Sequence, residues 1–523
     1  MIQGPINIHP DWEHIDGRLV FSPQTFEADI VIIGTGAGGG VAAEELCKAG
    51  LSVLLVEMGP FKTAKDFTME ERTAYPDLYQ EAAARKTKDK AISIFQGRCV
   101  GGSTTVNWTT SIRTPKPTQQ FWAERFAVKL EGKDDLTPYF QKAEKRLNIS
   151  PWHVPPNPNN AALRDGCIKL GWEYTVIARN VKGCANLGYC GMGCPMNAKQ
   201  SMLVTTIPEA LNLGATLLSS VYVEKAVHQH GKITSLTCYA MDQNHQPQSD
   251  IPLKIHAKQF IFAAGSIGTP AIMLRSNLPD PSGRLGKHTY LHPVVISGGF
   301  MKDIHGHSGA PQSIYSDEFV WKHGADGPIG YKLEVPPIHP VLIGSKLSGY
   351  GQPHADIMHR FNDLQIMLAL LRDGFHPDSQ GGTVRLNDYG EPILDYPLND
   401  YLWNGIRRAF LTMAELQFAS GAKAVFPAHD DAKQVKTWSA AQSMIEDLLL
   451  EAYRTVICSA HVMGGCNMGE DPANSVVNSY GQHHQIENLY VFDGSVFPTS
   501  LGANPQLSIY GLVYRNVARL LAG

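Results

Sequence analysis

The segment ADIVIIGTGAGGGVAAEELCKAGLSVLLVEMGP, residues 28–60, constrains the fold of this 523-residue chain more than any other part of it. An apolar run ends at Gly34, a glycine-rich turn and a small-residue helix pattern follow, and a second apolar run ends at Glu57. This order predicts a strand, a helix and a parallel strand, the unit that opens a Rossmann-type sheet. Because Gly34, Gly36 and Gly39 occupy the glycine positions of G-x-G-x-x-G, we expect a dinucleotide at this turn.

The chemistry of that motif explains its residue types. The first glycine permits a tight turn, the second lets the backbone approach a pyrophosphate, and the third lets the helix and strand pack closely. The helix N-terminus attracts phosphates, and the carboxylate of Glu57 can accept hydrogen bonds from ribose hydroxyls. A glycine-rich turn without a ligand is the alternative, but the spacing of strand, helix and acidic residue favours a nucleotide. The motif alone does not separate NAD from FAD.

Length and composition narrow the class of protein. A chain of this length indicates two to four domains. Charged residues make up 18%, and the formal net charge is −4 without a basic block, which argues against a nucleic-acid partner. The N-terminus lacks the apolar core of a signal peptide, and no run approaches the roughly 18 apolar residues of a membrane span. We therefore expect a cytoplasmic protein and leave peripheral membrane contact open.

Three further stretches complete the expected first domain. KQFIFAAGSIGTPAIMLRS (258–276) predicts a strand followed by a helix. The tail, 487–523, predicts a strand, a loop and a long final helix that returns to this domain. Residues 150–200 are rich in Pro, Asn and Gly, which predicts a surface loop.

The stretch from about 290 to 450 differs in pattern and has no glycine motif. VVISGGF (294–300) predicts a strand, whereas LQIMLALLRDG (364–374) and LWNGIRRAFLTMAELQFASG (402–421) predict amphipathic helices. We assign this stretch to a second domain that shapes a substrate cavity.

Four later motifs follow the glycine-rich turn in a fixed order. They are QGRCVGGSTTVNWTTSIRTP (96–115), FAAGSIGTPAIMLRSN (262–277), HVMGGCNMG (461–469) and NLYVFDGSVFPTSLGANPQLSI (488–509). Together with the turn they resemble the glucose–methanol–choline (GMC) family of FAD oxidoreductases over nearly the whole chain. The sequences GGCNMG, GANPQLS and CGMGCPMNAKQS are most similar to the long-chain-alcohol-oxidase and cholesterol-oxidase branch.

The resemblance implies an α/β fold with two domains. A discontinuous Rossmann-type FAD-binding domain would span 1–290 and 455–523, including an N-terminal extension (1–27) and the Pro- and Cys-containing region 150–200. An α+β substrate domain with an antiparallel sheet would span 291–454.

The resemblance also implies a set of FAD-contacting residues. The tight Gly101–Gly102–Ser103 loop would pass beside the flavin, and the backbone of Val223 would hold the adenine. Asp493 would lie beside the ribityl chain, although a solvated loop carboxylate is its alternative. The full expected set is Gly34, Gly36, Gly39, Glu57, Gly101, Gly102, Ser103, Asn107, Val223, Ala264, Gly265, Asp493, Gly494, Asn504 and Pro505.

His461 and Asn504 are the expected catalytic pair. Removing a hydride from a carbinol carbon requires that the hydroxyl proton also leaves, and an imidazole can accept it near neutral pH. The place of His461 before GGCNMG favours it among 20 histidines. Asn504 precedes Pro505, so a helix cap is its simplest interpretation. The resemblance also places that helix N-terminus at the flavin pyrimidine, where Asn504 would face the substrate oxygen.

Two weaker candidates remain open. Glu334 would line the substrate cavity by resemblance, but a surface glutamate is an equal alternative. Cys184, Cys190 and Cys194 lie in CANLGYCGMGCP, where three thiolates could ligate an iron–sulfur cluster or zinc. A structural loop or a disulfide competes with that metal site.

The expected function is FAD-dependent oxidation of a lipophilic alcohol to an aldehyde or ketone by hydride transfer to flavin N5. Oxygen or a quinone or cytochrome would then take the electrons. The alternatives are a sugar or polyol dehydrogenase with an iron–sulfur relay, another flavin reaction on a lipid such as desaturation, and a non-catalytic flavin carrier.

Overall fold

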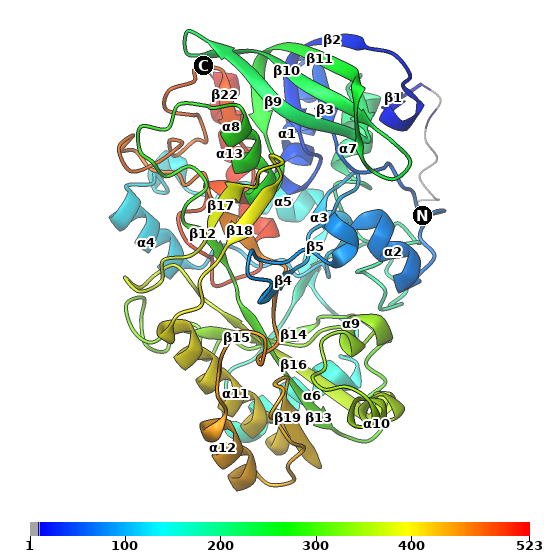
Figure 1. Ribbon diagram of the computed structural model, residues 1–523, viewed down its shortest axis with the longest axis vertical. Coiled ribbons are helices and arrows are strands. Elements are labelled where there is room, and N and C mark those ends of the chain that lie inside the picture. The colour runs from blue at the N-terminus through cyan, green and yellow to red at the C-terminus, as the bar shows by residue number, and fades with distance from the viewer. Residues whose placement is uncertain (1–8, 10, 523) are drawn as a thin grey trace.

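The larger sheet of the protein has eight strands and carries the N-terminal glycine-rich turn. The computed structural model describes residues 9 and 11–522, so the first part of the expected N-terminal extension lies outside the described residues. The strand order is β1 (Glu13–Asp16), β8 (Thr216–Ser219), β3 (Val53–Val56), β2 (Gln24–Ile33), β11 (Pro247–Phe262), β10 (Lys232–Met241) and β9 (Val221–Gln229), with β22 (Leu489–Val491) also on β11. This sheet forms the upper half of the molecule in Figure 1.

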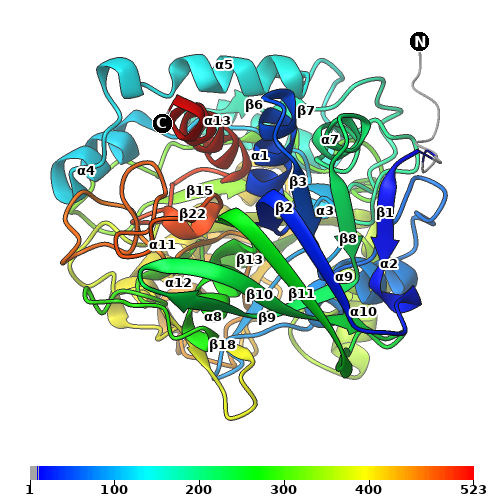
Figure 2. The ribbon, with the colours of Figure 1, turned by 90° about the horizontal axis from the view of Figure 1, so that it is seen from above.

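The centre of this sheet is parallel, as the first segment predicts. β2 pairs in parallel with both β3 and β11, and every residue of β3 is buried. Buried parallel strands are covered on both faces, which explains their continuous apolar runs. The helix α1 (Ala37–Lys48), which follows β2, lies on one face beside the final helix α13 (Gln506–Ala522), as Figure 2 shows. The predicted strand, helix and strand are confirmed, and so is the final helix.

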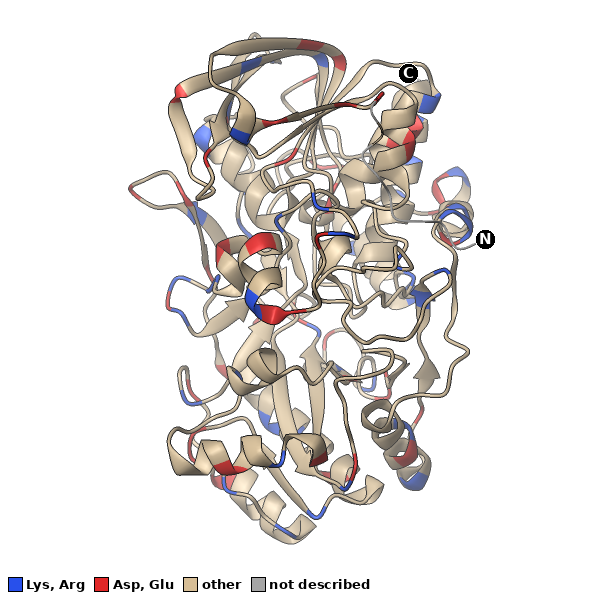
Figure 3. Ribbon diagram, turned by 90° about the vertical axis from the view of Figure 1, so that its right-hand side faces the viewer, with Lys and Arg blue, Asp and Glu red and all other residues tan. Residues whose placement is uncertain are grey.

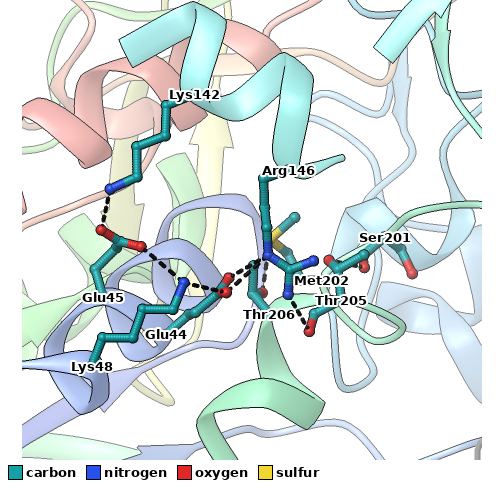
Figure 4. A network of polar contacts seen from close by, with 9 residues as sticks. All are labelled: Glu44, Glu45, Lys48, Lys142, Arg146, Ser201, Met202, Thr205 and Thr206. Carbon is teal, nitrogen blue, oxygen red and sulfur yellow. Dashed lines mark hydrogen bonds and ion pairs between the residues drawn. The ribbon is translucent and has the colours of Figure 1, made fainter. Parts of the chain in front are cut away.

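An ion-pair network fixes α1 against its neighbours (Figure 4). The nearly fully buried carboxylate of Glu44 accepts hydrogen bonds from Arg146 Nε at 2.8 Å and Lys48 Nζ at 2.7 Å. Arg146 ends α5 (Thr137–Arg146), and its Nη2 also donates to Thr205 O at 2.9 Å. A buried carboxylate needs such partners to offset its desolvation. The network therefore holds in place the helix whose N-terminus begins at the glycine-rich turn.

A second, six-stranded sheet lies in the lower half of the molecule (Figure 1). Its order is β15 (Tyr331–Glu334), β16 (Leu364–Leu371), β13 (Val294–Phe300), β20 (Ile457–Ser459) and β4 (Ile92–Ile94), with β19 (Ala424–Pro427) also on β13. All of its pairs are antiparallel except β20 with β4. The expected combination of a Rossmann-type sheet and an antiparallel sheet is confirmed. The domain boundaries remain a prediction, and β4 and β20 come from outside 291–454.

The structure corrects two secondary-structure predictions. LQIMLALL is the strand β16 rather than a helix, and all eight of its residues are buried. A strand covered on both faces has no alternation to distinguish it from a buried helix. Residues 150–200 are not only loop, because they contain the helix α6 (Pro158–Leu170). Its cap follows the usual rule: the side chain of Asn157 accepts a hydrogen bond from Asn160 N, and Pro158 takes the first helical position.

The helix predicted at 402–421 is confirmed as α11 (Asp400–Ser420), which packs on β13, β16 and α6. The strand–helix pattern at 258–276 is also confirmed, since α8 (Gly265–Arg275) follows β11. The remaining elements are α2 (Glu71–Leu78), α3 (Ser103–Val106), α4 (Lys116–Phe126), α7 (Thr206–Asn212), α9 (Pro340–Gly344), α10 (Gln352–His359), α12 (Trp438–Asp447), β5 (Ile149–Pro151), β6 (Thr175–Val176), β7 (Ala178–Asn180), β12 (Thr289–Leu291), β14 (Ile314–Tyr315), β17 (Thr383–Leu386), β18 (Pro392–Asp395) and β21 (Val462–Gly464).

Acidic and basic residues are interspersed over the face that Figure 3 shows, which fits the net charge of −4. Among the helices described, none combines the length and the apolar character that crossing a membrane would need.

Candidate functional site

A cavity of about 620 Å³ lies between the two sheets. On one side it is lined by the carboxyl ends of parallel strands, through Ile33 at the end of β2, Glu57 directly after β3 and Ala263 directly after β11. On the other side it is lined by alternate residues of the second sheet, Val294 and Ile296 of β13 and Ile366, Leu368 and Leu370 of β16. Ligands of open α/β sheets bind outside the carboxyl ends of the strands, so the cavity occupies the position expected of a cofactor site.

The glycine-rich turn is shaped by close backbone contacts. Gly34 has φ +97°, and a Cβ there would lie 2.3 Å from Ala263 O. A Cβ on Gly39 would lie 1.9 Å from Gly34 O, so this glycine lets the helix approach the strand and does not line the cavity. At Gly36 the nearest atom to a Cβ is Gly102 Cα, at 3.9 Å. The turn therefore leaves space at its middle glycine, as a bound pyrophosphate would require.

Glu57 is buried and belongs to a hydrogen-bonded link between segments. Its Oε2 accepts from Thr35 N at 3.0 Å and Thr35 Oγ1 at 2.6 Å, and its Oε1 accepts from Gly59 N at 2.9 Å. The hydroxyl of Thr35 in turn accepts from Gly101 N at 2.9 Å. Burial raises the pKa of Glu57, and these donors oppose that shift. The carboxylate thus holds the glycine-rich turn and the Gly101 loop in a fixed relation beside the cavity.

The Gly101–Asn107 segment crosses the cavity close to the turn. Gly102, with φ +53°, lies so near Gly36 that a Cβ would approach its Cα to 2.8 Å. Gly102, Ser103 and Asn107 line the cavity, whereas Gly101 lies behind them. The amide of Asn107 is engaged by the protein, since Nδ2 donates to Gln506 Oε1 at 2.8 Å and Oδ1 accepts from Thr109 N. Val223 lines the far end of the same cavity.

Asp493 is a buried structural acceptor rather than a solvated loop carboxylate. It is 5% exposed, and its Oδ2 accepts from Gly265 N at 2.8 Å and Thr269 Oγ1 at 2.6 Å. Burial raises its pKa, and these donors oppose the shift. Ala264, Gly265, Asp493 and Gly494 all line the cavity, so the ends of β11 and β22 meet there.

His461 and His292 form a hydrogen-bonded pair at the cavity wall. The two residues extend the antiparallel pairing of β12 with β21, in which Leu291 lies opposite Val462. Their Nδ1 atoms lie 3.0 Å apart, and Gly502 N donates to the other ring nitrogen of His292 at 3.2 Å. Desolvation, and secondarily the positive charge of Lys332, lowers the pKa of His461 to about 4. The His461 imidazole is therefore neutral near pH 7.

Asn504 and Glu334 meet on the same cavity. The side chain of Asn504 does not cap α13, because its Nδ2 lies 3.5 Å from Glu334 Oε2 and its Oδ1 is buried without a partner among the described residues. Glu334 is 1% exposed, its Oε2 also accepts from Gln312 Nε2 at 2.7 Å, and burial raises its pKa. The surface alternative for Glu334 is therefore wrong. Asn504, Glu334, His461 and Pro505 all line the cavity.

The three cysteines lie elsewhere. Cys184, Cys190 and Cys194 surround a separate small hollow of about 30 Å³, and their thiols are free. Within the part of the chain that the structure describes, no three His, Cys, Asp or Glu side chains are grouped to hold a metal ion. Nothing in the geometry of the described residues supports an iron–sulfur cluster or an electron relay through one.

Sequence reasoning missed three contributors to the site. Thr35 joins the turn to Glu57, His292 pairs with His461, and Lys332 places a buried positive charge near that pair. Thr35 lies inside the glycine motif, where its hydroxyl could have been noticed. His292 and Lys332 lie 169 and 129 residues before His461, so only the fold brings them together.

Comparisons with known proteins agree with this geometry. Models of the GMC oxidoreductase N-terminal and C-terminal regions match residues 75–294 and 377–512. A long-chain-alcohol oxidase of Arabidopsis thaliana is 29% identical over 95% of this chain and 69% of its own length. An uncharacterized GMC-type oxidoreductase of Mycobacterium tuberculosis is 30% identical over 94% of this chain and 75% of its own.

Solved structures share the fold. A formate oxidase of Aspergillus oryzae superimposes with a TM-score of 0.71 at 16% identity, covering 96% of this chain and 99% of that chain. A pyridoxine 4-oxidase from Mesorbium loti gives a TM-score of 0.67 at 18% identity, covering 95% and 99%. Because the two family models match residues 75–294 and 377–512, the chain belongs to the GMC oxidoreductase family and is an FAD-dependent oxidoreductase.

Proposed function

We propose that FAD lies in the large cavity with its pyrophosphate at the Gly34–Gly39 turn and its ribose at Glu57. The free space at Gly36, where the nearest protein atom to a Cβ is 3.9 Å away, carries this assignment. The Gly102–Ser103 loop and Asn107 would flank the flavin, and Val223 would lie at the adenine. Gly265, Asp493 and Gly494 would follow the ribityl chain, and Pro505, directly before α13, would lie at the pyrimidine.

Gly36→Ala tests this placement. The protein has room for the added methyl group and the backbone has φ −70°, so the melting temperature of FAD-free protein should stay at the wild-type value. Affinity for FAD should fall at least tenfold, because the methyl group occupies space that only a ligand would use. Fluorescence titration of FAD-free protein measures the affinity. Unchanged FAD affinity in this variant would contradict the assignment.

We further propose that the enzyme oxidises a lipophilic alcohol to an aldehyde or ketone. When bound, FAD supplies the acceptor for the hydride that leaves the carbinol carbon. His461, kept neutral by its surroundings, takes the hydroxyl proton at its Nε2. Asparagine cannot act as a base near neutral pH. Asn504 would therefore donate a hydrogen bond from Nδ2 and so orient the substrate oxygen beside His461. Glu334 would hold the Asn504 amide at the cavity wall.

The cavity wall supports an apolar substrate. Its side on the second sheet is built from five aliphatic residues of β13 and β16, and Leu342 and Ile343 of α9 add to it. Burying each methylene of a substrate chain against such a wall is worth about 0.8 kcal/mol. The long-chain-alcohol oxidases among the relatives favour the same substrate class.

We propose oxygen as the electron acceptor, with quinone or cytochrome as the alternative acceptor. We also propose a cytoplasmic location.

The catalytic assignment is tested by His461→Ala. The variant should bind FAD, since the imidazole lines a cavity and is not part of an apolar core. Its flavin should be reduced about two to four orders of magnitude more slowly, because that is the usual contribution of a general base. Asn504→Ala should slow reduction less. Stopped-flow spectroscopy without oxygen measures both, and wild-type reduction by His461→Ala would overturn the assignment.

A further inference from the structure

The His292–His461 pair holds two rings whose hydrogen-bond directions are linked. The pair arises from strand register, because His292 and His461 follow the Leu291–Val462 pair of β12 and β21. His292 is 2% exposed, and both of its ring nitrogens have partners: Nδ1 meets His461 Nδ1 at 3.0 Å, and Nε2 meets Gly502 N at 3.2 Å. Turning the ring over would put carbon atoms against both partners, so the two contacts agree on its orientation.

The backbone of Gly502 fixes the direction of the chain of hydrogen bonds. A peptide N–H can only donate, so His292 Nε2 must be the bare, accepting nitrogen. A neutral imidazole then carries its proton on Nδ1, which must donate to His461 Nδ1. His461 Nδ1 is therefore the bare nitrogen of its own ring, and its proton lies on Nε2. The one hydrogen bond of the His461 ring among the described residues is made by Nδ1, and His461 lines the cavity, so Nε2 is the ring nitrogen left for a ligand there.

We propose that His292 is a positioning residue that sets the tautomer of His461, so that the free enzyme presents Nε2–H of His461 to the cavity as a hydrogen-bond donor. This inference rests on the proposed function and refines it. To accept a proton at Nε2, His461 must adopt the other tautomer, with its Nδ1–H donating to His292 Nδ1. His292 would then carry its proton on Nε2, facing the N–H of Gly502, and a buried hydrogen bond would be lost.

Adding a proton to the pair meets the same obstacle. With one proton shared between the two Nδ1 atoms, a protonated pair must carry protons on both Nε2 atoms, including the one that faces Gly502. Burial disfavours a charged His292 ring, and charge on His461, Lys332 and Arg372 disfavours it further, so the pKa of His292 lies well below its usual range. The tautomer of His461 that can accept a proton at Nε2 therefore forms only when the Gly502–His292 hydrogen bond opens. The N–H of Gly502 thus controls proton acceptance by His461.

The tautomer can be measured without turnover. Histidine labelled with ¹⁵N in the ring is incorporated into the FAD-bound enzyme, and the His461 signals are identified by their loss in His461→Gln. Without substrate at pH 7, we expect His461 to show a protonated Nε2 and a bare Nδ1. A bare Nε2 with a protonated Nδ1 would overturn the proposal.

Two variants of His292 separate positioning from simple structural support. In His292→Gln the amide can accept from Gly502 and donate to His461, so the Nε2–H tautomer should persist and flavin reduction should stay within about threefold of wild type. His292→Leu removes both contacts, so the tautomer preference should vanish. The limiting rate of flavin reduction should then rise, because the tautomer of His461 that can accept a proton at Nε2 no longer requires the Gly502–His292 hydrogen bond to open, with little change in alcohol affinity. Wild-type ¹⁵N signals in His292→Leu would refute the inference.

The two proposals can fail separately. If His461→Ala reduces its flavin at the wild-type rate, the proposed function fails whatever the ring signals show. If His461→Ala is slow but the wild-type ring is bare at Nε2, the proposed function stands and the tautomer assignment falls.

Discussion

The pH dependence of flavin reduction follows from the surroundings of His461. Burial, with a smaller contribution from the positive charge of Lys332, lowers its pKa from 6.5 to about 4. A base acts in its neutral form, so activity is kept above the pKa and lost as the pH falls through it. At pH 5 a group with a pKa of about 4 is about nine-tenths neutral, whereas one at 6.5 is about 3% neutral. Reduction at pH 5 should therefore be about 30-fold faster than an ordinary histidine would allow.

The assay is the limiting rate of flavin reduction by a saturating alcohol, measured without oxygen from pH 4 to 8. Circular dichroism at each pH confirms that the protein remains folded. Lys332→Met should move the midpoint to higher pH, because it removes the second cause of the lowered pKa. Glu334→Gln should leave the midpoint in place, which excludes titration of that buried carboxyl. A wild-type midpoint near 6.5 would show that burial does not lower the pKa of the catalytic base.

Substitutions at Arg146, Gly38 and Glu334 test the fold and the site, two of them against a control variant. Arg146→Met leaves the buried Glu44 with one partner fewer and should lower the free energy of unfolding, measured in urea titrations, by about 1–3 kcal/mol. The control Arg113→Met breaks a more exposed ion pair and should lower the free energy of unfolding by less than about 1 kcal/mol. In Gly38→Ala the new Cβ would lie 1.5 Å from Phe492 O, so the purified protein should lack FAD or fail to fold; a normal visible spectrum would contradict this. Glu334→Leu removes the acceptor of the buried Gln312 and Asn504 amides and should slow flavin reduction about tenfold, which corresponds to a loss within the usual range of about 1–3 kcal/mol for an unpaired buried group. Glu334→Gln keeps an accepting oxygen and should not slow it. Equal rates in the two variants would exclude the role of Glu334.

The sequence predicts secondary structure best where the residue pattern of an element lies within one short segment of the chain. The glycine-rich turn, the helix at 402–421 and the final helix each carry their periodicity within one segment. LQIMLALL was not predictable in this way, because both faces of β16 are buried and the alternation that marks a strand disappears.

The same distinction holds at the candidate site. The Gly102 loop and Asp493 belong to motifs that can be seen in the chain, and the structure brings both to one cavity. The burial of Glu334 depends on the pairing of β15 with β16 at the edge of the second sheet, beside the cavity, which no local pattern reveals. The His292–His461 contact joins residues 169 positions apart through the register of β12 and β21, so it required the fold.

Bleaching of the bound flavin by alcohols of different chain length tests whether this enzyme oxidises lipophilic alcohols. The purified enzyme is mixed without oxygen with ethanol, glycerol, octanol and dodecanol, and the absorbance of oxidised flavin is followed. We predict rapid bleaching by octanol and dodecanol, slow or no bleaching by ethanol and glycerol, and return of the oxidised spectrum when air is admitted. A flavin that no alcohol bleaches, or that only glycerol bleaches, would contradict the account.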